Sequence, residues 1–178
     1  MTREELEHAI RAACEIAQDD AVFVFGSQAI LGQFPEAPAT LRQSVEVDIS
    51  PVNKPERADA IDGAIGELSP FHQAFGFYVH GAPIDETAVL PPGWRDRTVT
   101  VRDPVGTRGA TGLCLEVHDL AASKLAAFRE RDRDFVRTLL VERMVDQAVL
   151  LGRIGALDLR TDERDRRATW VRRTGSEL

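Results

Sequence analysis

The sequence predicts an α/β (α+β) fold with a small mixed sheet, helices against one face of that sheet, and a helical C-terminal part. Two observations predict this class. Segments with the hydrophobic periodicity of helices and of strands follow one another over the first two thirds of the chain, and helical periodicity dominates the last third. The 178 residues, with 43% hydrophobic and 29% charged side chains, suit one globular domain and exclude disordered and fibrous classes.

The first helix and the first strand have the clearest patterns. Thr2 and Glu5 stand at the spacing of a capping box, and apolar residues recur at helical spacing over 3–17. The continuous apolar run over 21–25 is rich in β-branched and aromatic residues, which indicates a buried strand. This strand is expected to end at Gly26.

The next four segments alternate between helix, loop and strand. We expect one or two helical turns over 27–32 and a proline-containing loop over 33–43. Over 44–50, apolar and polar residues alternate with period two, which predicts a strand with one polar face. The apolar spacing over 55–68 predicts a second helix with a proline near its start.

Short strands and longer helices are expected in the rest of the chain. The predicted strands cover 75–80, 97–102 and 112–117, and the predicted helices cover 118–129 and 131–152. The arginine-rich tail from Asp158 predicts a marginal helix or a mobile arm. We therefore divide the chain into an α/β core, residues 1–117, and a C-terminal helical part, residues 118–178, that closes over a cleft of the same domain.

Cysteine and histidine residues give no sign of a disulfide framework or a zinc site. Cys14 and Cys114 lie on a predicted helix and a predicted strand, without a C-x-x-C pair, and are expected to be buried free thiols. The histidines have no ligand spacing among them, so each is expected to be a surface or satisfied core residue. They are His8, His72, His80 and His118.

Hydropathy and charge narrow the range of partners. No segment has the length and hydrophobicity of a membrane span or a signal peptide, which predicts a cytoplasmic protein without a membrane partner. The net charge of −7 divides into −10 for residues 1–90, with 5 bases against 15 acids, and +3 for residues 91–178, with 17 bases against 14 acids. Because a ligand responds to local charge, the acidic total does not exclude a polyanionic partner.

Two carboxylates and a glycine carry the first chemical signal. On a strand, side chains at i and i+2 point to the same face, so Glu46 and Asp48 are expected side by side. Such a pair repels unless a cation lies between the two groups, and Mg²⁺ prefers oxygen ligands of this kind. Gly26 lacks a Cβ atom and would let backbone N–H groups approach a phosphate. The alternative for the two carboxylates is an ordinary solvated sheet face.

Two blocks of the sequence together resemble a known superfamily. An apolar strand, Gly-Ser, a short helix and then acidic-x-Asp on the next strand are similar to the polymerase-beta-type nucleotidyltransferases. The stretch S-V-E-V-D-I at 44–49 resembles their strand motif T-x-D-I-D. The block H-D-L-A-A-S-K-L-A-A-F-R-E-R-D at 118–132 resembles the downstream segment of the AbiEii and MenT-type nucleotidyltransferase toxins.

The resemblance implies an enzyme that moves an NMP from an NTP to an acceptor hydroxyl, with Mg²⁺ as its cofactor. The implied metal ligands are Glu46 and Asp48, and the implied catalytic set is Asp48, Glu46, Lys124 and Asp132. The implied nucleotide-binding residues are Gly26, Ser27, Lys124, Arg129 and Arg131. Asp132 would lie near Lys124 and orient it or assist the incoming nucleophile. The structural alternatives are a solvated helix face for the charges over 129–134 and a helix cap for Ser27.

The MenT-type branch implies the 3′ end of tRNA as acceptor, extended from CTP or UTP, with a neighbouring antitoxin protein as partner. It also makes Ser27 a candidate phosphorylation site. Arginines of the second half give a physical reason to expect an RNA backbone, namely Arg95, Arg97, Arg102, Arg108, Arg129, Arg131 and those over 160–173. The rival acceptor is a small molecule such as an antibiotic, as in another branch of the superfamily.

Departures from the family pattern leave open a catalytically silent binding or regulatory protein. Glu46 stands where the family has Asp, which is one methylene shorter, and the spacing from Ser27 to Glu46 is longer than usual. An alternative register pairs Asp48 with Ser50 and predicts an inactive site. Glu116, on a predicted strand, is a candidate for the third carboxylate that activates the attacking hydroxyl in many relatives, with a structural role as the alternative.

Overall fold

The computed structural model describes residues 1–176 and divides into two compact units. The core unit consists of Met1–Thr87 and Thr98–Leu115. The C-terminal unit consists of Ala88–Arg97 and the chain from Glu116 onward. The expected sheet lies in the core unit, and the expected long helices lie in the C-terminal unit.

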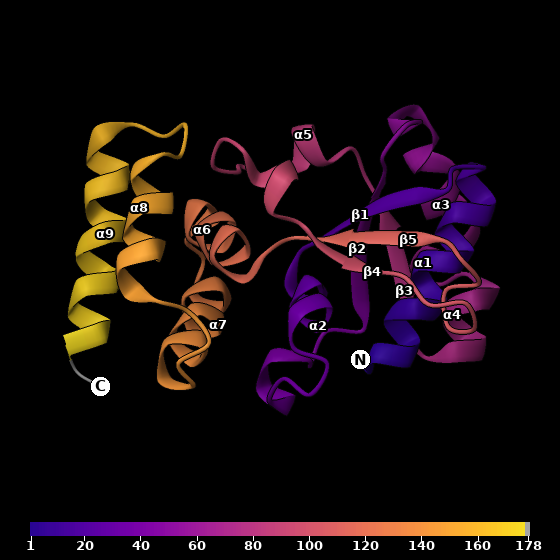
Figure 1. Cartoon of the computed structure of the whole chain (residues 1–178), viewed down its shortest axis with the longest axis horizontal. Coiled ribbons are helices and arrows are strands. Elements are labelled where there is room, and N and C mark those ends of the chain that lie inside the picture. The colour runs from indigo at the N-terminus through magenta and orange to yellow at the C-terminus, as the bar shows by residue number, and fades with distance from the viewer. Residues whose placement is uncertain (177–178) are drawn as a thin grey trace. The chain divides into compact units, whose positions relative to one another are not determined.

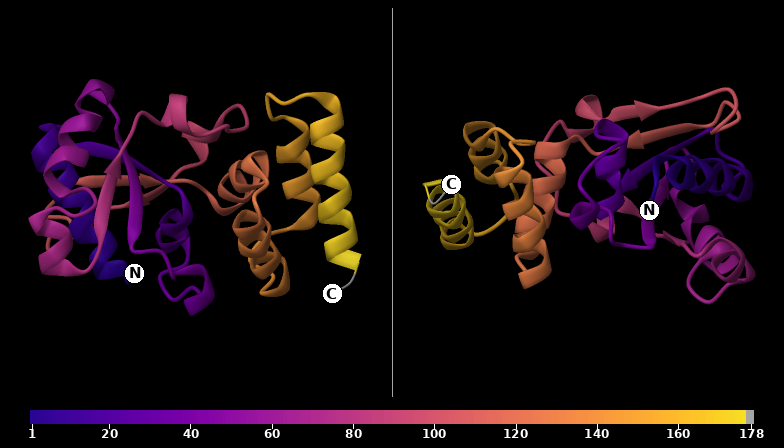
Figure 2. Two further views of the ribbon diagram at one scale, coloured as in Figure 1. Left: turned by 180° about the vertical axis from the view of Figure 1, so that it is seen from behind. Right: turned by 90° about the horizontal axis from the view of Figure 1, so that it is seen from below.

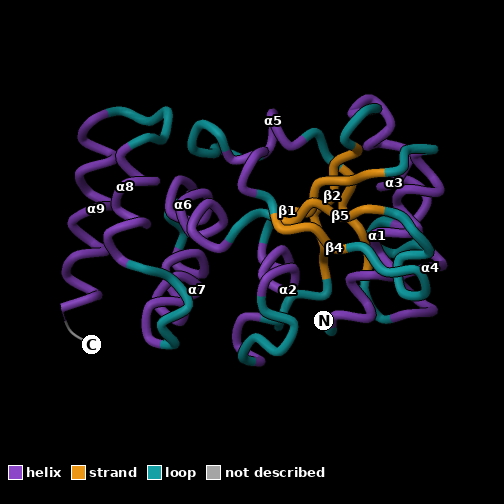
Figure 3. The backbone as a smooth tube through the Cα atoms, in the orientation of Figure 1, coloured by secondary structure: helices purple, strands orange, loops and turns teal. Residues whose placement is uncertain are grey.

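A five-stranded mixed sheet forms the centre of the core unit (Figure 3). Its strands are β1 (Ala21–Phe25), β2 (Glu46–Pro51), β3 (Tyr78–Gly81), β4 (Val99–Val101) and β5 (Thr111–Cys114). The order is β3-β2-β1-β5-β4, with β1 antiparallel to β2 and parallel to β5. The β2–β3 pair is parallel and the β4–β5 pair is antiparallel. The expected α/β class with a mixed sheet is therefore confirmed, and the apolar run at 21–25 is its central strand.

Helices of the core unit cover one face of this sheet (Figures 1 and 2). They are α1 (Arg3–Ala17), α2 (Ile30–Gln33) and α3 (Ala58–Ile65), with the short turns η1 (Ser27–Ala29) and η3 (Pro55–Arg57) before α2 and α3. The capping box of Thr2 and Glu5 is present at the start of α1. The layers are close together, because a Cβ atom on Gly112 of β5 would overlap the side chain of Ile10 in α1.

The period-two pattern of β2 separates an apolar face of the sheet from a polar one. Val47 and Ile49 are fully buried on the face that the helices cover. Each such side chain contributes roughly 1.5–3 kcal/mol of hydrophobic stabilisation. Glu46 and Asp48 point to the opposite face, where 39% and 22% of their side chains remain exposed. The core therefore fixes which face the two carboxylates occupy, since a shift of one residue would bury both charges.

Several boundaries in the core unit differ from the prediction. The helix predicted over 55–68 ends at Ile65, and the following residues form a separate helix, α4 (Pro70–Phe75). The strand predicted over 112–117 ends at Cys114, and Glu116 is the N-cap of the next helix. Short helical turns also lie within connecting segments, namely η2 (Ala39–Leu41), α5 (Ile84–Thr87) and, in the C-terminal unit, η4 (Trp94–Arg97).

Four helices build most of the C-terminal unit. They are α6 (Val117–Ala127), α7 (Glu130–Val141), α8 (Gln147–Gly155) and α9 (Thr161–Ser176). The prediction of one continuous helix over 131–152 is wrong. The chain leaves α7 through Arg143, whose φ of +54° is left-handed, and α8 begins afresh with Asp146 as its N-cap. Leucine and alanine continue across this break, so hydrophobic spacing alone did not reveal it.

The arginine-rich tail forms the helix α9, which packs beside α8 (Figures 1 and 2). Trp170 and Val171 are buried, and so is Arg167. The guanidinium of Arg167 donates to the carbonyl oxygens of Leu125 and Ala126, each at 3.0 Å. Carbonyls at a helix C-terminus lack partners within the helix, so Arg167 completes the end of α6. The helical alternative for the tail is therefore confirmed for residues 161–176; residues 177 and 178 lie outside the described part.

Both cysteines are buried free thiols, as expected. Burial raises the pKa of Cys14 and of Cys114 to about 12, which keeps both groups protonated and unreactive at neutral pH. Among the described residues, no helix is long and apolar enough to cross a membrane.

Candidate functional site

Strand β1 ends in a backbone conformation that favours glycine. Gly26 has φ +65° and ψ −168°, a region essentially restricted to glycine. A Cβ atom at this position would overlap Oδ2 of Asp48. Asp48 is the register partner of Phe25, the last residue of β1. The main chain therefore turns from β1 against the carboxylate of Asp48.

Ser27 is the first residue of the short helix η1, and Gly26 occupies the N-cap position. The alternative that Ser27 is the helix cap is therefore wrong. The predicted pair of Gly26 and Ser27 does lie at the carboxyl end of β1, next to the strand that carries Glu46 and Asp48. This part of the predicted site is assembled within the core unit.

A histidine that the sequence reasoning did not select joins the two carboxylates. In the parallel β2–β3 pair, Asp48 is opposite His80 and Glu46 is opposite Tyr78. Nδ1 of His80 lies 3.0 Å from Oδ1 of Asp48 and 3.7 Å from Oε1 of Glu46. His80 is partly exposed and hydrogen-bonded to Asp48, which agrees with the expected surface or satisfied residue, but its place beside both carboxylates was not predicted. A short strand over 75–80 was predicted, but the register that places His80 beside Asp48 is a tertiary feature.

Hydrogen bonds and charges hold the three groups together. The Tyr78 hydroxyl donates to Oε2 of Glu46 at 3.1 Å, and burial together with the Glu46 charge raises the pKa of Tyr78 to about 12. Burial alone would lower the pKa of His80. The hydrogen bond to Asp48 and the negative charges of Asp48, Glu46 and Asp62 outweigh burial, so the pKa of His80 is raised. Tyr78 therefore orients Glu46, and the His80 ring lies close to one oxygen of each carboxylate.

The second predicted block forms a cluster in the C-terminal unit. Nζ of Lys124 lies 3.7 Å from Oδ1 of Asp132, which is the proximity that the resemblance implies. Asp132 is fully buried and accepts from Nε of Arg129 at 2.7 Å. Arg131 is exposed on α7. The guanidinium of Arg129 thus pairs with Asp132, and the roles of all four residues toward a nucleotide remain predictions.

Glu116 has a structural role. It is the N-cap of α6 and accepts from the backbone N–H groups of His118 and Asp119. Oε1 of Glu116 also lies 2.6 Å from Nδ1 of His118, whose Nε2 accepts from the backbone N–H of Asp146 at 2.8 Å. Burial raises the pKa of Glu116, but these hydrogen bonds and the His118 ring outweigh it, so the pKa is lowered. The structural alternative for Glu116 is confirmed.

Comparison with models of protein families identifies the family of the chain. The sequence model of the family described as "Nucleotidyltransferase of unknown function (DUF6036)" matches residues 4–172. The chain belongs to the DUF6036 family. No curated protein and no solved structure matches the DUF6036 chain. The resemblance to nucleotidyltransferases is thereby confirmed, whereas the AbiEii and MenT-type branch remains a prediction.

The core unit of this DUF6036 protein presents a group of ligands suited to a divalent cation. Glu46, Asp48 and His80 each offer a ligand atom, and these atoms lie within 4.8 Å of one another. The two carboxylates fit the Mg²⁺ that the sequence predicts, because Mg²⁺ prefers oxygen. The imidazole does not fit that preference, because nitrogen ligands suit transition metals better.

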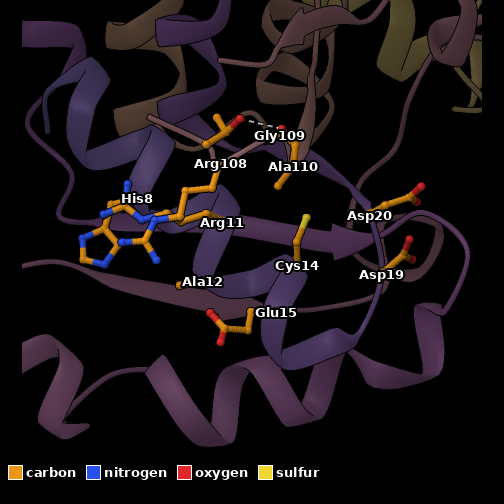
Figure 4. Close-up of a pocket in the computed structure, with 11 residues that line it drawn as sticks. His8, Arg11, Ala12, Cys14, Glu15, Asp19, Asp20, Arg108, Gly109 and Ala110 are labelled. Atoms are coloured by element: carbon orange, nitrogen blue, oxygen red, sulfur yellow. Dashed lines mark hydrogen bonds between the residues drawn. The ribbon is translucent and has the colours of Figure 1, made fainter. Parts of the chain in front are cut away.

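A separate cavity of about 520 Å³ lies at the opposite end of β1 (Figure 4). Asp19 and Asp20 directly precede β1, whereas Gly26 follows it. Figure 4 shows His8, Arg11 and Arg108 on one side of this cavity, with Asp19 and Asp20 on the other. Arg108 lines this cavity and is among the arginines expected to contact an RNA backbone. This cavity is therefore separate from the acidic site.

Proposed function

We propose that this DUF6036 protein transfers an NMP from an NTP to an acceptor hydroxyl, with a divalent cation bound at Glu46 and Asp48. The observation that carries the proposal is the convergence of these carboxylates beside Gly26, at the end of the central strand of a nucleotidyltransferase-family chain. When bound, the cation would neutralise charge on the triphosphate and on its leaving group. Mg²⁺ is the ion that the two carboxylates alone predict.

The side chains of the core unit supply positioning. Because Gly26 lacks a Cβ atom, the carboxylate of Asp48 lies directly against the main chain at the end of β1. Tyr78 fixes the longer side chain of Glu46, which supports a competent site despite the substitution for Asp. Ser50 is buried, and its hydroxyl accepts from the backbone N–H of Ile84 at 3.3 Å. This bond supports the register with Glu46 and Asp48 over the inactive one with Asp48 and Ser50.

The chemistry is an in-line displacement at the α-phosphorus. A bond forms between the acceptor oxygen and the α-phosphorus, the bond to the bridging oxygen of the β-phosphate breaks, and pyrophosphate leaves. The acceptor hydroxyl releases its proton to solvent. Catalysis of this kind rests on positioning and charge neutralisation. Lys124 is the proposed phosphate contact of the C-terminal unit, and Asp132 and Arg129 are its neighbours.

For the acceptor we propose the 3′ end of a tRNA, as the MenT-type resemblance implies. A cluster of guanidinium groups in the C-terminal unit supports a polyanionic acceptor. Two arginines that are not buried, Arg133 and Arg166, lie 5.1 Å and 5.3 Å from the centre of the Phe128 ring. Arginines gathered in this way suit a phosphate backbone. The choice of CTP or UTP, the toxin role, phosphorylation of Ser27 and the antitoxin partner rest on the resemblance alone.

The test is incubation of the purified protein with total tRNA, a divalent cation and each labelled NTP in turn. We expect label in tRNA with wild-type protein and none with Asp48→Asn. The matched control is Asp59→Asn, an exposed carboxylate on α3, which should retain labelling. Label in an added antibiotic instead of RNA would select the small-molecule acceptor. No label, together with no NTP binding by calorimetry, would overturn the proposal in favour of a silent binding protein.

A further inference from the structure

The third donor at the acidic site is a nitrogen atom. We propose that His80 is a metal ligand together with Glu46 and Asp48, and that the site therefore prefers Mn²⁺ over Mg²⁺. This inference rests on the proposed function, since the cation is the one that serves the nucleotide. It concerns the identity of that cation and the residue that selects it.

The spacing of the donor atoms fits one ion. Adjacent ligands of an octahedral ion with bonds of about 2.1 Å lie about 3 Å apart. Nδ1 of His80 lies 3.0 Å from Oδ1 of Asp48, which is this separation, and 3.7 Å from Oε1 of Glu46. For all three atoms to contact one ion, the His80 ring would turn Nδ1 from the Asp48 oxygen toward the ion, and the flexible Glu46 side chain would move closer.

The fold prepares this arrangement before any ion binds. Asp48 and His80 are register partners on two adjacent strands, so their backbones hold the two side chains at a fixed separation. Tyr78 is the register partner of Glu46 and donates to its second carboxylate oxygen. A hydrogen bond on the oxygen that does not face the ion orients a carboxylate ligand and tunes its affinity.

The kind of donor then sets the preference. Mg²⁺ is a hard ion that takes oxygen ligands and retains its waters, so an imidazole adds little to its binding. Mn²⁺ accepts carboxylate, water and phosphate oxygens in the same octahedral geometry. As a transition metal it also gains from an imidazole nitrogen. A site with two carboxylates and one imidazole therefore discriminates between the two ions through His80.

The experiment measures binding of each ion without nucleotide or acceptor. Mn²⁺ affinity is taken from the loss of the free-ion EPR signal, and Mg²⁺ affinity from competition with Mn²⁺. The wild-type protein should bind Mn²⁺ more tightly than Mg²⁺, and His80→Asn should weaken Mn²⁺ binding by about tenfold or more while changing Mg²⁺ binding far less. His80→Asp supplies a third carboxylate and should shift the preference toward Mg²⁺.

A spectroscopic readout identifies the ligand directly. Electron spin-echo spectra of bound Mn²⁺ should contain nitrogen modulation in the wild-type protein and lose it in His80→Asn. The control is His8→Gln, because His8 packs against Phe71 and Phe75 and is not one of the proposed metal ligands. This variant should retain both the affinity and the nitrogen signal.

Absence of nitrogen modulation in the wild-type spectrum would overturn the inference, as would an unchanged ion preference in both His80 variants. If His80→Asn does not fold, the wild-type spectrum still tests nitrogen ligation, and the ion preference of His80→Asp still tests the role of His80. Failure of this inference is distinguishable from failure of the proposed function. If Mg²⁺ and Mn²⁺ support NMP transfer equally, only the proposed ion preference is contradicted. If Mn²⁺ binds through nitrogen but no NMP transfer is detected, only the proposed reaction is contradicted.

Discussion

The two units treat their carboxylates in opposite ways. In the C-terminal unit, Asp119 and Asp132 are fully buried, and each contacts two cationic side chains. In the core unit, Glu46 and Asp48 remain 39% and 22% exposed and share the imidazole of His80. A buried carboxylate is tolerated only when it is fully paired, so the first pattern marks structural ion pairs. The second pattern, two accessible carboxylates beside one imidazole, suits the binding of a metal ion.

Removing one carboxylate from the core unit should have the largest effect on activity. Asp48→Asn deletes the charge that faces Gly26 and His80, so NMP transfer should fall on the order of 10²–10³-fold. The melting temperature should stay nearly unchanged or rise, because two facing carboxylates repel. Labelled transfer assays and thermal unfolding measure the two quantities. A large loss of stability with retained NMP transfer would show that Asp48 has a structural role, like the buried carboxylates of the C-terminal unit.

Removing a buried carboxylate from the C-terminal unit should instead reduce stability. Asp119 accepts from Nε of Arg97 at 2.8 Å and lies 3.0 Å from Nε of Arg153. Asp119→Asn leaves both guanidiniums without their counter-charge, and the free energy of unfolding should fall by about 3 kcal/mol. Urea unfolding measures this change. The folded variant should bind nucleotide and metal as tightly as the wild type. Weaker binding of nucleotide or metal without a loss of stability would contradict the structural role of Asp119.

Gly26 tests whether the accessible carboxylates depend on the turn after β1. Gly26→Ala places a Cβ atom in a conformation that costs about 1–3 kcal/mol and pushes it against Asp48. Both the melting temperature and divalent-cation affinity should decrease. Gly63→Ala is the matched control, since a Cβ atom there meets nothing within 4 Å in the middle of α3. That variant should gain about 0.5–1 kcal/mol and bind cations normally.

The same contrast explains what the sequence could predict. Local signals sufficed for the capping box at Thr2, for the central strand over 21–25, and for the shared face of Glu46 and Asp48. His80 was missed because its place beside Asp48 depends on which residues of β2 and β3 are paired, and that pairing joins segments 32 residues apart.

The C-terminal unit shows the same limit. Arg167 was counted among the basic residues of a polar tail, yet it is buried and completes the end of α6. Arginines with structural partners and arginines that face solvent are alike in sequence. The break between α7 and α8 at Arg143 could not be predicted either, because the hydrophobic spacing continues on both sides of it. Pairing over long distances, and not composition, therefore separates structural charges from candidate ligands.

Lys124 offers the smallest and most discriminating test, because it belongs to a buried ion pair and is also the predicted phosphate contact. Its partner Asp132 keeps the closer ion pair with Arg129, at 2.7 Å against 3.7 Å. Lys124→Ala should therefore lower the free energy of unfolding by less than about 1 kcal/mol. NTP affinity, measured by calorimetry, should fall clearly. Lys54→Ala is the control, since this other lysine of the chain donates to the Gln18 carbonyl and should not affect NTP affinity. A large stability loss with unchanged NTP affinity would assign Lys124 to the structural ion pairs that characterise its unit.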